Sequence, residues 1–275
     1  MSNETLIIQA GLSERPRKSR LPARLDLLQS ISGLFLALFM WFHMFFVASI
    51  LGGADTMWKI TKFFEGYFIF GKSYPWLVSI VVAVVICIFV LHAMLAVRKF
   101  PINYRQFKLY RAHAKSMQHG DTTMWMWQVY TGFAMFFLAS AHLYQMFVWP
   151  QLIGPYGSGD RMWSDVLWPF YLVLLLLVEF HAGIGLYRLA VKWCWPNVSR
   201  DFLKKLKWGL TAFFLILGLA TLAAYMKIGY ENRHNYGNPY TPAWAQQAQN
   251  EIDTTTAATT SDTLTLAQQA EESAK

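Results

Sequence analysis

Hydrophobic residues gather in long stretches along the chain, and shorter polar segments separate them. An α-helix needs about 20 apolar residues to cross the hydrocarbon core of a bilayer. Five stretches meet this requirement: residues 30–52, 75–97, 123–149, 166–190 and 208–228. Pro75 opens the second stretch and Pro169 lies near the start of the fourth, where a helix tolerates proline. The pattern predicts an all-α membrane protein with five transmembrane helices.

Composition agrees with a membrane protein and removes several other classes. Hydrophobic residues make up 55% of the chain and charged residues only 15%, against about 25% charged residues in an average soluble domain. The net charge of +8 is not arranged as a basic stripe, so it indicates membrane orientation rather than nucleic-acid binding. Cys87 and Cys194 form no C-x-x-C pair, which excludes a c-type haem attachment motif and argues against an iron–sulfur cluster.

The charges of the connecting segments predict the topology. Lys and Arg are concentrated in the N-terminal arm and in segments 98–120 and 188–207, whereas segments 53–74 and 150–165 are weakly charged. Because basic loops stay on the cytoplasmic side, the N-terminus is expected in the cytoplasm and the C-terminus outside. The charge-interrupted aromatic residues 56–70 are then expected at the outer membrane interface.

The same pattern suggests how the chain is divided. Residues 1–29 lack the apolar core of a signal peptide and are expected to form a cytoplasmic arm before the membrane domain, residues 30–228. Residues 229–275 form a non-cytoplasmic tail, whose Thr-, Ala- and Gln-rich part from about residue 242 is expected to be disordered. The sequence has no internal repeat, which weighs against an inverted-repeat transporter.

Four histidines lie inside the first four stretches, one in each: His43, His92, His142 and His181. The first and third helices run outward, and their histidines lie far from their inner ends. The second and fourth helices run inward, and their histidines come shortly before their inner ends. His43 and His142 therefore share an outer level and His92 and His181 an inner one, separated by roughly 10 Å or more.

Two such pairs suit two b-type haems. Each haem iron would take one neutral imidazole on each face, which fills its axial positions and leaves electron transfer as its task. We expect the first four helices to form a bundle around these haems. Four glycines could provide room for the macrocycles, or could serve close helix packing instead: Gly33, Gly132, Gly183 and Gly185. For a single intramembrane histidine, hydrogen bonding between helices is an equally good explanation.

Several long stretches resemble one family of membrane subunits. They are Gly33-Leu-Phe-Leu with His43-Met-Phe-Phe-Val, residues 98–106 (RKFPINYRQ), 119–123 (HGDTT), 131–138 (TGFAMFFL) and 185–193 (GLYRLAVKW). Over residues 1–230 the chain resembles the diheme cytochrome b subunit of quinol:fumarate reductase, in the class with one five-helix anchor, within the succinate:quinone oxidoreductases.

The resemblance implies a place in a larger complex. His92 and His181 would hold the proximal haem, nearest a cytoplasmic iron–sulfur subunit, and His43 and His142 the distal haem. An FAD-containing flavoprotein would reduce fumarate to succinate with electrons from menaquinol oxidised near the distal haem. The complex would lie in the bacterial cytoplasmic (inner) membrane, where a dimer of heterotrimers is one possible assembly.

The resemblance also assigns roles to polar residues. Glu65 matches the glutamate at the menaquinol site and would accept a quinol proton, although the sequence alone favours a solvated loop glutamate. Its aromatic neighbours would suit a quinone pocket: Phe63, Phe64, Tyr67 and Phe68. Glu179 matches a glutamate implicated in proton transfer across the membrane; it lies about 200° around the helix from His181 and is expected to face another part of the interior. Residues at inner helix ends match contacts of the proximal haem propionates: Gln29, Ser30, Trp125 and Lys192.

Three other functions stay open at the level of sequence. The same anchor could run in reverse as part of a succinate:quinone reductase. A cytochrome b subunit of a hydrogenase or formate dehydrogenase would share the histidine pattern but not the matching stretches. A haem-free transporter or scaffold would use the histidines only to join helices.

Overall fold

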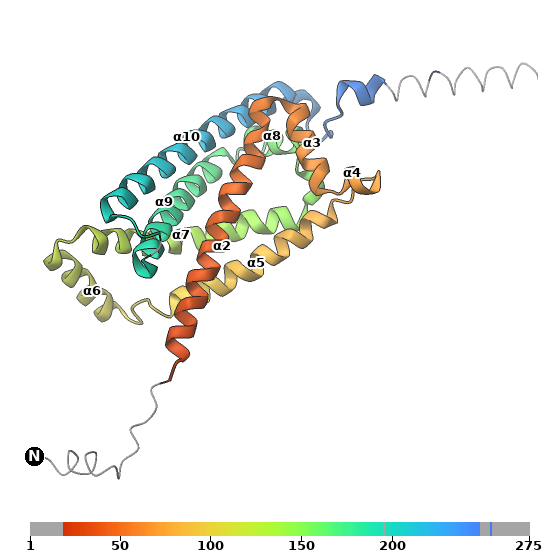
Figure 1. The fold of residues 1–275 in the computed structure, drawn as a ribbon. Coiled ribbons are helices and arrows are strands. Elements are labelled where there is room, and N and C mark those ends of the chain that lie inside the picture. The colour runs from red at the N-terminus through yellow and green to blue at the C-terminus, as the bar shows by residue number, and fades with distance from the viewer. Residues whose placement is uncertain (1–18, 195, 248–253, 255–275) are drawn as a thin grey trace, which may run out of the picture.

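The computed structural model describes residues 19–194, 196–247 and 254. These residues form helices and connecting turns without strands (Figure 1). The long helices are α2 (Leu21–Ala48), α5 (Trp76–Val97), α7 (Gly120–Val148), α9 (Trp168–Trp193) and α10 (Arg200–Asn232). All five are long and apolar enough to cross a membrane, which confirms the predicted fold class.

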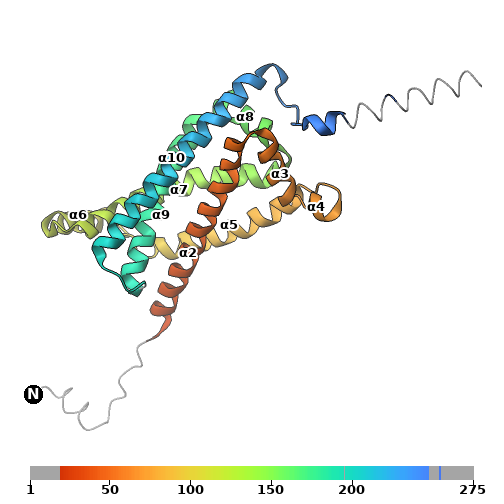
Figure 2. The ribbon, with the colours of Figure 1, turned by 45° about the horizontal axis from the view of Figure 1, so that its top comes forward.

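Shorter helices connect the long ones. On the way from α2 to α5 the chain forms η1 (Ser49–Gly52), α3 (Ala54–Phe64) and α4 (Tyr67–Phe70). Helix α6 (Tyr104–Met117) precedes α7, and η2 (Pro150–Leu152) and α8 (Pro155–Trp163) precede α9. The turn η3 (Arg233–Asn235) follows α10. Figures 1 and 2 both place α3, α4 and α8 at one end of the bundle and α6 at the other.

Two of the long helices extend well beyond the predicted spans. Helix α2 begins nine residues earlier than residue 30, and α10 begins at Arg200 instead of residue 208. The apolar stretch measures the part that crosses hydrocarbon, whereas backbone hydrogen bonding continues into the charged ends. Pro22 occupies the first turn of α2, and the Ser199 hydroxyl caps α10 by accepting a hydrogen bond from the Phe202 amide at 3.2 Å.

The first four long helices form a closed arrangement in which each contacts the next. Helix α2 packs on α5, α5 on α7 and α7 on α9, and α9 returns to α2. Helix α10 lies outside this ring against α9 and α2. Stacking of Trp41 on Phe214 at 5.1 Å joins α2 to α10, and Gly218 lets α10 approach Leu175 of α9. This arrangement leaves space between α2, α5, α7 and α9.

The end with α3 and α8 is held by buried polar contacts. Asp160 of α8 is 4% exposed and accepts hydrogen bonds from the Asn232 side chain at 3.1 Å and from the Gly237 amide at 3.0 Å. A Cβ atom on Gly229 would lie 2.1 Å from the Gly159 carbonyl oxygen, so glycine is needed where α10 and α8 touch. These contacts fix α8 on the end of α10.

The described part of the C-terminal tail folds back onto α3. The Tyr240 hydroxyl donates a hydrogen bond to Asp55 at 2.6 Å, and Trp244 packs edge-on against Trp58 with ring centroids 5.6 Å apart. Burial, together with the hydrogen bond to the Asp55 carboxylate, raises the pKa of Tyr240 to about 12. Most of the segment expected to be disordered, residues 248–253 and 255–275, lies outside the described residues.

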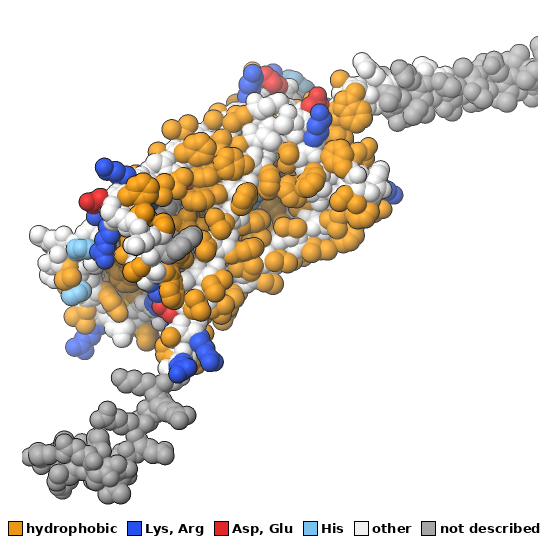
Figure 3. Space-filling model, viewed as in Figure 1, with side chains coloured by type: hydrophobic (Ala, Val, Ile, Leu, Met, Phe, Trp, Pro, Cys, Tyr) orange, Lys and Arg blue, Asp and Glu red, His pale blue; other side chains and the backbone are white. Residues whose placement is uncertain are grey.

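The surface of the bundle is apolar along its length. Figure 3 shows hydrophobic side chains over the middle of the visible face, with Lys and Arg gathered towards the two ends. Large apolar side chains on different long helices are open, among them Phe42 at 61% and Ile216 at 68% exposure. Such a surface is stable only when covered, and lipid is the covering that five apolar helices fit.

Candidate functional site

A cavity of about 1180 Å³ lies inside the ring of α2, α5, α7 and α9. This volume lies above the roughly 300–1000 Å³ of an ordinary small-molecule pocket, so the space can take a large ligand. All four intramembrane histidines line it: His43, His92, His142 and His181. Residues of α3, α8 and α10 complete the wall at one end, so the cavity is lined by more than the first four helices.

His43 and His142, the pair expected at the outer level, face each other across the cavity. The imidazole rings of His43 and His142 have centroids 6.1 Å apart and are tilted by 53°. A metal–imidazole bond measures about 2.0–2.1 Å for zinc, so two such bonds span about 4 Å. The distances from each ring centroid to its ligating nitrogen account for the rest of the centroid separation. The structure thus brings together the two residues expected at the same depth, and the separation of their rings leaves room for one metal ion. That they share one haem stays a prediction.

The inner pair depends on two glycines. His92 and His181 line the same cavity. A Cβ atom on Gly33 would lie 2.8 Å from Cε1 of His92, and one on Gly132 would lie 2.7 Å from Cε1 of His181. Since real Cβ contacts are longer, each glycine makes the space in which an imidazole ring sits. Two of the four expected glycines thus serve the histidine rings themselves.

The remaining two glycines serve helix packing. A Cβ atom on Gly183 would lie 2.5 Å from the Thr211 hydroxyl of α10. One on Gly185 would lie 2.9 Å from the side-chain nitrogen of Gln128 on α7. Both positions bring α9 close to its neighbours, which is the packing alternative that the sequence left open.

Hydrogen bonds orient the inner imidazoles. Nδ1 of His181 lies 3.0 Å from the Gln128 carbonyl oxygen and 3.4 Å from the Thr131 hydroxyl. A carbonyl only accepts, so Nδ1 carries the proton and Nε2 keeps its lone pair. Nδ1 of His92 lies 3.1 Å from the Ser32 hydroxyl, which allows the same tautomer. Such outer hydrogen bonds are typical of histidines that bind metals through the other nitrogen.

The outer pair has a different partner. Nδ1 of His142 lies 3.3 Å from the Tyr171 hydroxyl of α9, which donates its own proton to Gln145 at 3.1 Å. The phenol oxygen is then an acceptor for His142. Phe39 stacks on His43, with ring centroids 6.0 Å apart. Sequence reasoning missed Tyr171, because only folding brings α9 against the histidine of α7.

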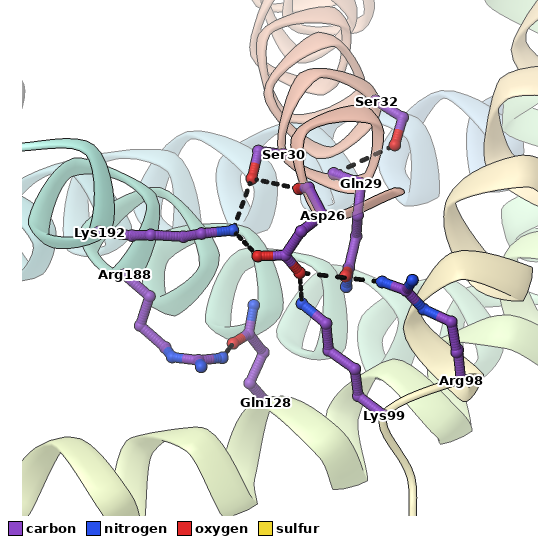
Figure 4. A network of polar contacts seen from close by, with 9 residues as sticks. All are labelled: Asp26, Gln29, Ser30, Ser32, Arg98, Lys99, Gln128, Arg188 and Lys192. Carbon is purple, nitrogen blue, oxygen red and sulfur yellow. Dashed lines mark hydrogen bonds and ion pairs between the residues drawn. The ribbon is translucent and has the colours of Figure 1, made fainter. Parts of the chain in front are cut away.

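Polar side chains gather at the inner end of the cavity (Figure 4). Lys192 of α9 donates hydrogen bonds to Asp26 and, at 3.3 Å, to the Ser30 hydroxyl. Gln29 and Trp125 line the cavity, and the buried Oε1 of Gln29 has no hydrogen-bond partner among the described residues. The four residues matched to the haem propionates, Gln29, Ser30, Trp125 and Lys192, thus lie at one cavity end.

Sequence reasoning missed other members of this polar group. Asp26 also contacts Lys99, which follows α5, and Arg98 at 3.8 Å. Arg188 donates to the Gln128 side chain beside the same space. A signal was present, because Arg98 and Lys99 belong to a matching stretch and Asp26 is an acid close to a basic arm.

Glu65 is not a solvated loop residue. It caps the C-terminus of α3, is 2% exposed, and its carboxylate accepts a hydrogen bond from Lys62 at 2.6 Å. Thr61 and Phe64 line the cavity beside it. Phe63 and Phe68 are 58% and 59% exposed and do not line the cavity, and neither does Tyr67, so of the four expected aromatic neighbours only Phe64 lines it.

Glu179 is the most deeply buried acid among the helical residues that the structure describes. It is 1% exposed, and its Oε1 atom is buried without a hydrogen-bond partner among the described residues. It lines the same cavity as His181, whereas the helical geometry led us to expect another part of the interior. Both side chains therefore lie on the wall of one cavity.

The donor set fits haem. Paired imidazoles suit axial ligation, the apolar wall suits a macrocycle, and the cationic inner end suits carboxylates. Among the described residues, no group of three or more metal-ligating side chains occurs. Pairs of histidines inside a large apolar cavity are therefore what the chain offers.

Comparisons with known proteins agree with this chemistry. A family model of succinate dehydrogenase/fumarate reductase transmembrane subunits matches residues 101–221. The chain is 53% identical over 226 residues to the fumarate reductase cytochrome b subunit of Helicobacter pylori strain J99, which covers 82% of this chain and 89% of that protein. It is 52% identical over 237 residues to the fumarate reductase cytochrome b subunit of Wolinella succinogenes, covering 84% and 93%.

Fold and site together define a haem-binding membrane anchor of the succinate dehydrogenase/fumarate reductase class. Within that class, the chain belongs to the family of fumarate reductase cytochrome b subunits. It is a multi-pass membrane subunit of an oxidoreductase complex, and cytochrome b chemistry implies haem b as its cofactor.

Proposed function

We propose that this chain oxidises menaquinol and passes the electrons through two b haems towards an iron–sulfur subunit and an FAD flavoprotein that reduces fumarate to succinate. The observation that carries the proposal is the presence of two histidine pairs along one continuous cavity. One haem per pair would supply reversible one-electron transfer. In this proposal fumarate is reduced in the flavoprotein, and the present chain is the electron-carrying subunit.

The histidines hold fixed roles in this proposal. His92 and His181 would ligate the proximal haem and His43 and His142 the distal one. Gly33 and Gly132 give the inner rings their space, and the Gln128 carbonyl holds His181 with Nε2 available as ligand. Gln29, Ser30, Trp125 and Lys192 would hold the propionates of the proximal haem through hydrogen bonds and charge, as their gathering at the inner cavity end supports.

Glu65 would accept a proton from menaquinol. Glu65 is buried and does not itself line the cavity, but its neighbours Thr61 and Phe64 do, and the apolar surface there can receive a quinol ring. Lys62 pairs with this carboxylate and so offsets the cost of burying its charge. A buried base beside an apolar pocket is suited to general-base work on a quinol hydroxyl.

Glu179 would carry protons through the bundle. Moving one electron charge against 100 mV costs about 2.3 kcal/mol, so a compensating proton lowers the work of crossing the membrane. Among the described residues, Oε1 of Glu179 has no hydrogen-bond partner, and this supports the role. A buried carboxyl with a purely structural role would be expected to have both oxygens in hydrogen bonds. The alternative is a protonated acid that bonds to a neighbour.

The proposed orientation in the membrane follows from the distribution of charge. The basic ends of α2, α5 and α9 would face the cytoplasm of a bacterium, with the α3 and α8 end outside the inner membrane. The same anchor could run as a succinate:quinone reductase, because direction depends on quinone potential. Neither a hydrogenase-type cytochrome b nor a haem-free scaffold has an observation here that favours it.

Haem content tests the proposal. The full chain is purified in detergent, and haem per chain is measured with a reduced-minus-oxidised spectrum. Two b-type haems are expected, with one lost in His43→Ala or His142→Ala and the other in His92→Ala or His181→Ala. His234→Ala, at an exposed position, is the matched control. A colourless wild-type protein would return the four histidines to helix packing.

A further inference from the structure

Charged side chains from three helix ends meet at the inner end of the cavity (Figure 4). Asp26 of α2 lies at the centre. One of its carboxylate oxygens contacts Lys99, which follows α5, and lies 3.8 Å from Arg98. The other accepts a hydrogen bond from Lys192 of α9. Asp26 thus joins α2 to the inner ends of α5 and α9, the helices that carry His92 and His181.

The charges in this group do not balance. Three cations, Arg98, Lys99 and Lys192, face a single carboxylate, which leaves two positive charges in excess. Lys99 and Lys192 also line the cavity. Both are still able to bond: an ammonium has three donors, and Lys99 makes hydrogen bonds only to Asp26 among the described residues. Arg188, which lines the same cavity and bonds to the neutral Gln128 side chain, adds to this positive excess, and a ligand with carboxylates would offset it.

We propose that Lys99 is a second cation for the two carboxylates of the inner haem, opposite Lys192, and that Asp26 is the positioning residue that holds both ammonium groups at the cavity mouth. The proposal rests on the proposed function, since it needs an inner haem. Lys192 and Lys99 come from opposite sides of the mouth, so each can meet one carboxylate. Asp26 keeps the two like charges close before the ligand enters and partly screens their repulsion.

Ser30 and Gln29 add to this arrangement. The Ser30 hydroxyl donates to the Asp26 backbone carbonyl at 2.9 Å and accepts from Lys192 at 3.3 Å, which ties the lysine to α2. Among the described residues, Gln29 has a buried side-chain oxygen without a partner at the same place. When the amide is turned over, its NH2 group occupies this position and can donate to a carboxylate.

A purely structural role for Lys99 makes a different prediction. Exposed ion pairs contribute little on their own, and the charged side chains of this group are 31–44% exposed. If Lys99 only tied α5 to Asp26, removing it would leave haem binding unchanged. Once Asp26 is neutralised, the loss of Lys99 would then have no further effect.

The test is the rate at which the purified full chain loses haem to an excess of apomyoglobin, followed by absorbance. Lys99→Met is expected to lose the inner haem about tenfold faster than wild type, the effect of losing one charge-assisted hydrogen bond, while the outer haem stays. Asp26→Asn/Lys99→Met is expected to lose it faster than Asp26→Asn alone. Lys227→Met, in an exposed pair with Glu231, is the matched control.

A second measurement keeps the outcome clear if a variant folds poorly. Apoprotein is loaded with haem whose two carboxylates are esterified, and the loss rate is measured again. With the esterified haem, wild type should lose the inner haem as fast as Lys99→Met loses it. The Lys99→Gln variant should show the same loss rates as Lys99→Met. Equal rates of Lys99→Met and wild type with ordinary haem, or an undiminished difference with the ester, would overturn the proposal. A wild type without any inner haem would instead overturn the proposed function.

Discussion

The contact between Gly132 and His181 allows a sharp test with one methyl group. In Gly132→Ala the new Cβ atom would lie 2.7 Å from Cε1 and 3.0 Å from Nδ1 of His181. Carbon atoms rest about 3.5–4.0 Å apart, so the ring must move by about 0.8 Å or α7 and α9 must separate. Either change disturbs the 3.0 Å hydrogen bond from Nδ1 to the Gln128 carbonyl.

The magnitude follows from these contacts. Forcing a methyl group into a packed site costs about 1–3 kcal/mol. Displacing a ligand that an outer hydrogen bond holds lowers metal affinity about 10–100-fold. We expect Gly132→Ala to lose the inner haem selectively, so that haem per chain falls towards one. The Gly33→Ala variant should behave in the same way, because its Cβ atom would meet His92 at 2.8 Å.

The assay is haem per chain of the purified protein with a thermal unfolding curve. Gly209→Ala is the matched control, because it also lies in a long helix and its Cβ atom would have no neighbour within 4 Å. Alanine is favoured over glycine in a helix by about 0.8–1.0 kcal/mol, so this variant should be at least as stable as wild type. If Gly132→Ala kept the haem content, the spectrum and the melting temperature of wild type, the reasoning about the inner pair would be wrong.

Three further predictions concern other contacts. Tyr171→Phe removes the acceptor for His142, which lowers the basicity of that ligand and should raise the midpoint potential of the outer haem only, in a redox titration. Lys62→Met leaves Glu65 buried without its partner, so quinol oxidation should fall while haem content stays. The free energy of unfolding should drop by about 1–3 kcal/mol, less than for a fully buried pair because Lys62 is partly exposed. The pKa of Tyr240 is raised to about 12, so the contribution of its hydrogen bond to the free energy of unfolding is present below about pH 10 and is lost as pH rises through 12. Tryptophan fluorescence of wild type and Tyr240→Phe as a function of pH checks this.

Each of these predictions has a result that contradicts it. An unchanged outer-haem potential in Tyr171→Phe would mean that His142 does not rely on the phenol. Full quinol oxidation in Lys62→Met would separate Glu65 from the quinol site. An identical alkaline transition in Tyr240→Phe and wild type would show that another group loosens the C-terminal segment.

Hydrophobic periodicity and the positions of the histidines were readable from the sequence because both depend on residues close in the chain. Twenty apolar residues must form a helix in lipid, since every backbone polar group has to be satisfied within the segment. The rise of about 1.5 Å per residue then placed His43 at the level of His142, and their rings lie 6.1 Å apart in the structure. Helix ends were less accurate, because α2 and α10 continue into charged residues beyond the apolar stretch.

Only the tertiary structure decided what surrounds those histidines. Gly132 could equally have served helix packing, as Gly183 does, until the neighbour across the gap was seen to be an imidazole ring. The burial of Glu65 depends on how α3 folds over the cavity, and a charged stretch of sequence says nothing of that. Asp26 meets Lys99 and Lys192 from positions 73 and 166 residues away. Such contacts arise from the packing of whole helices, so local patterns determined the membrane fold and the ligand levels, while the three-dimensional arrangement determined the partners of each functional side chain.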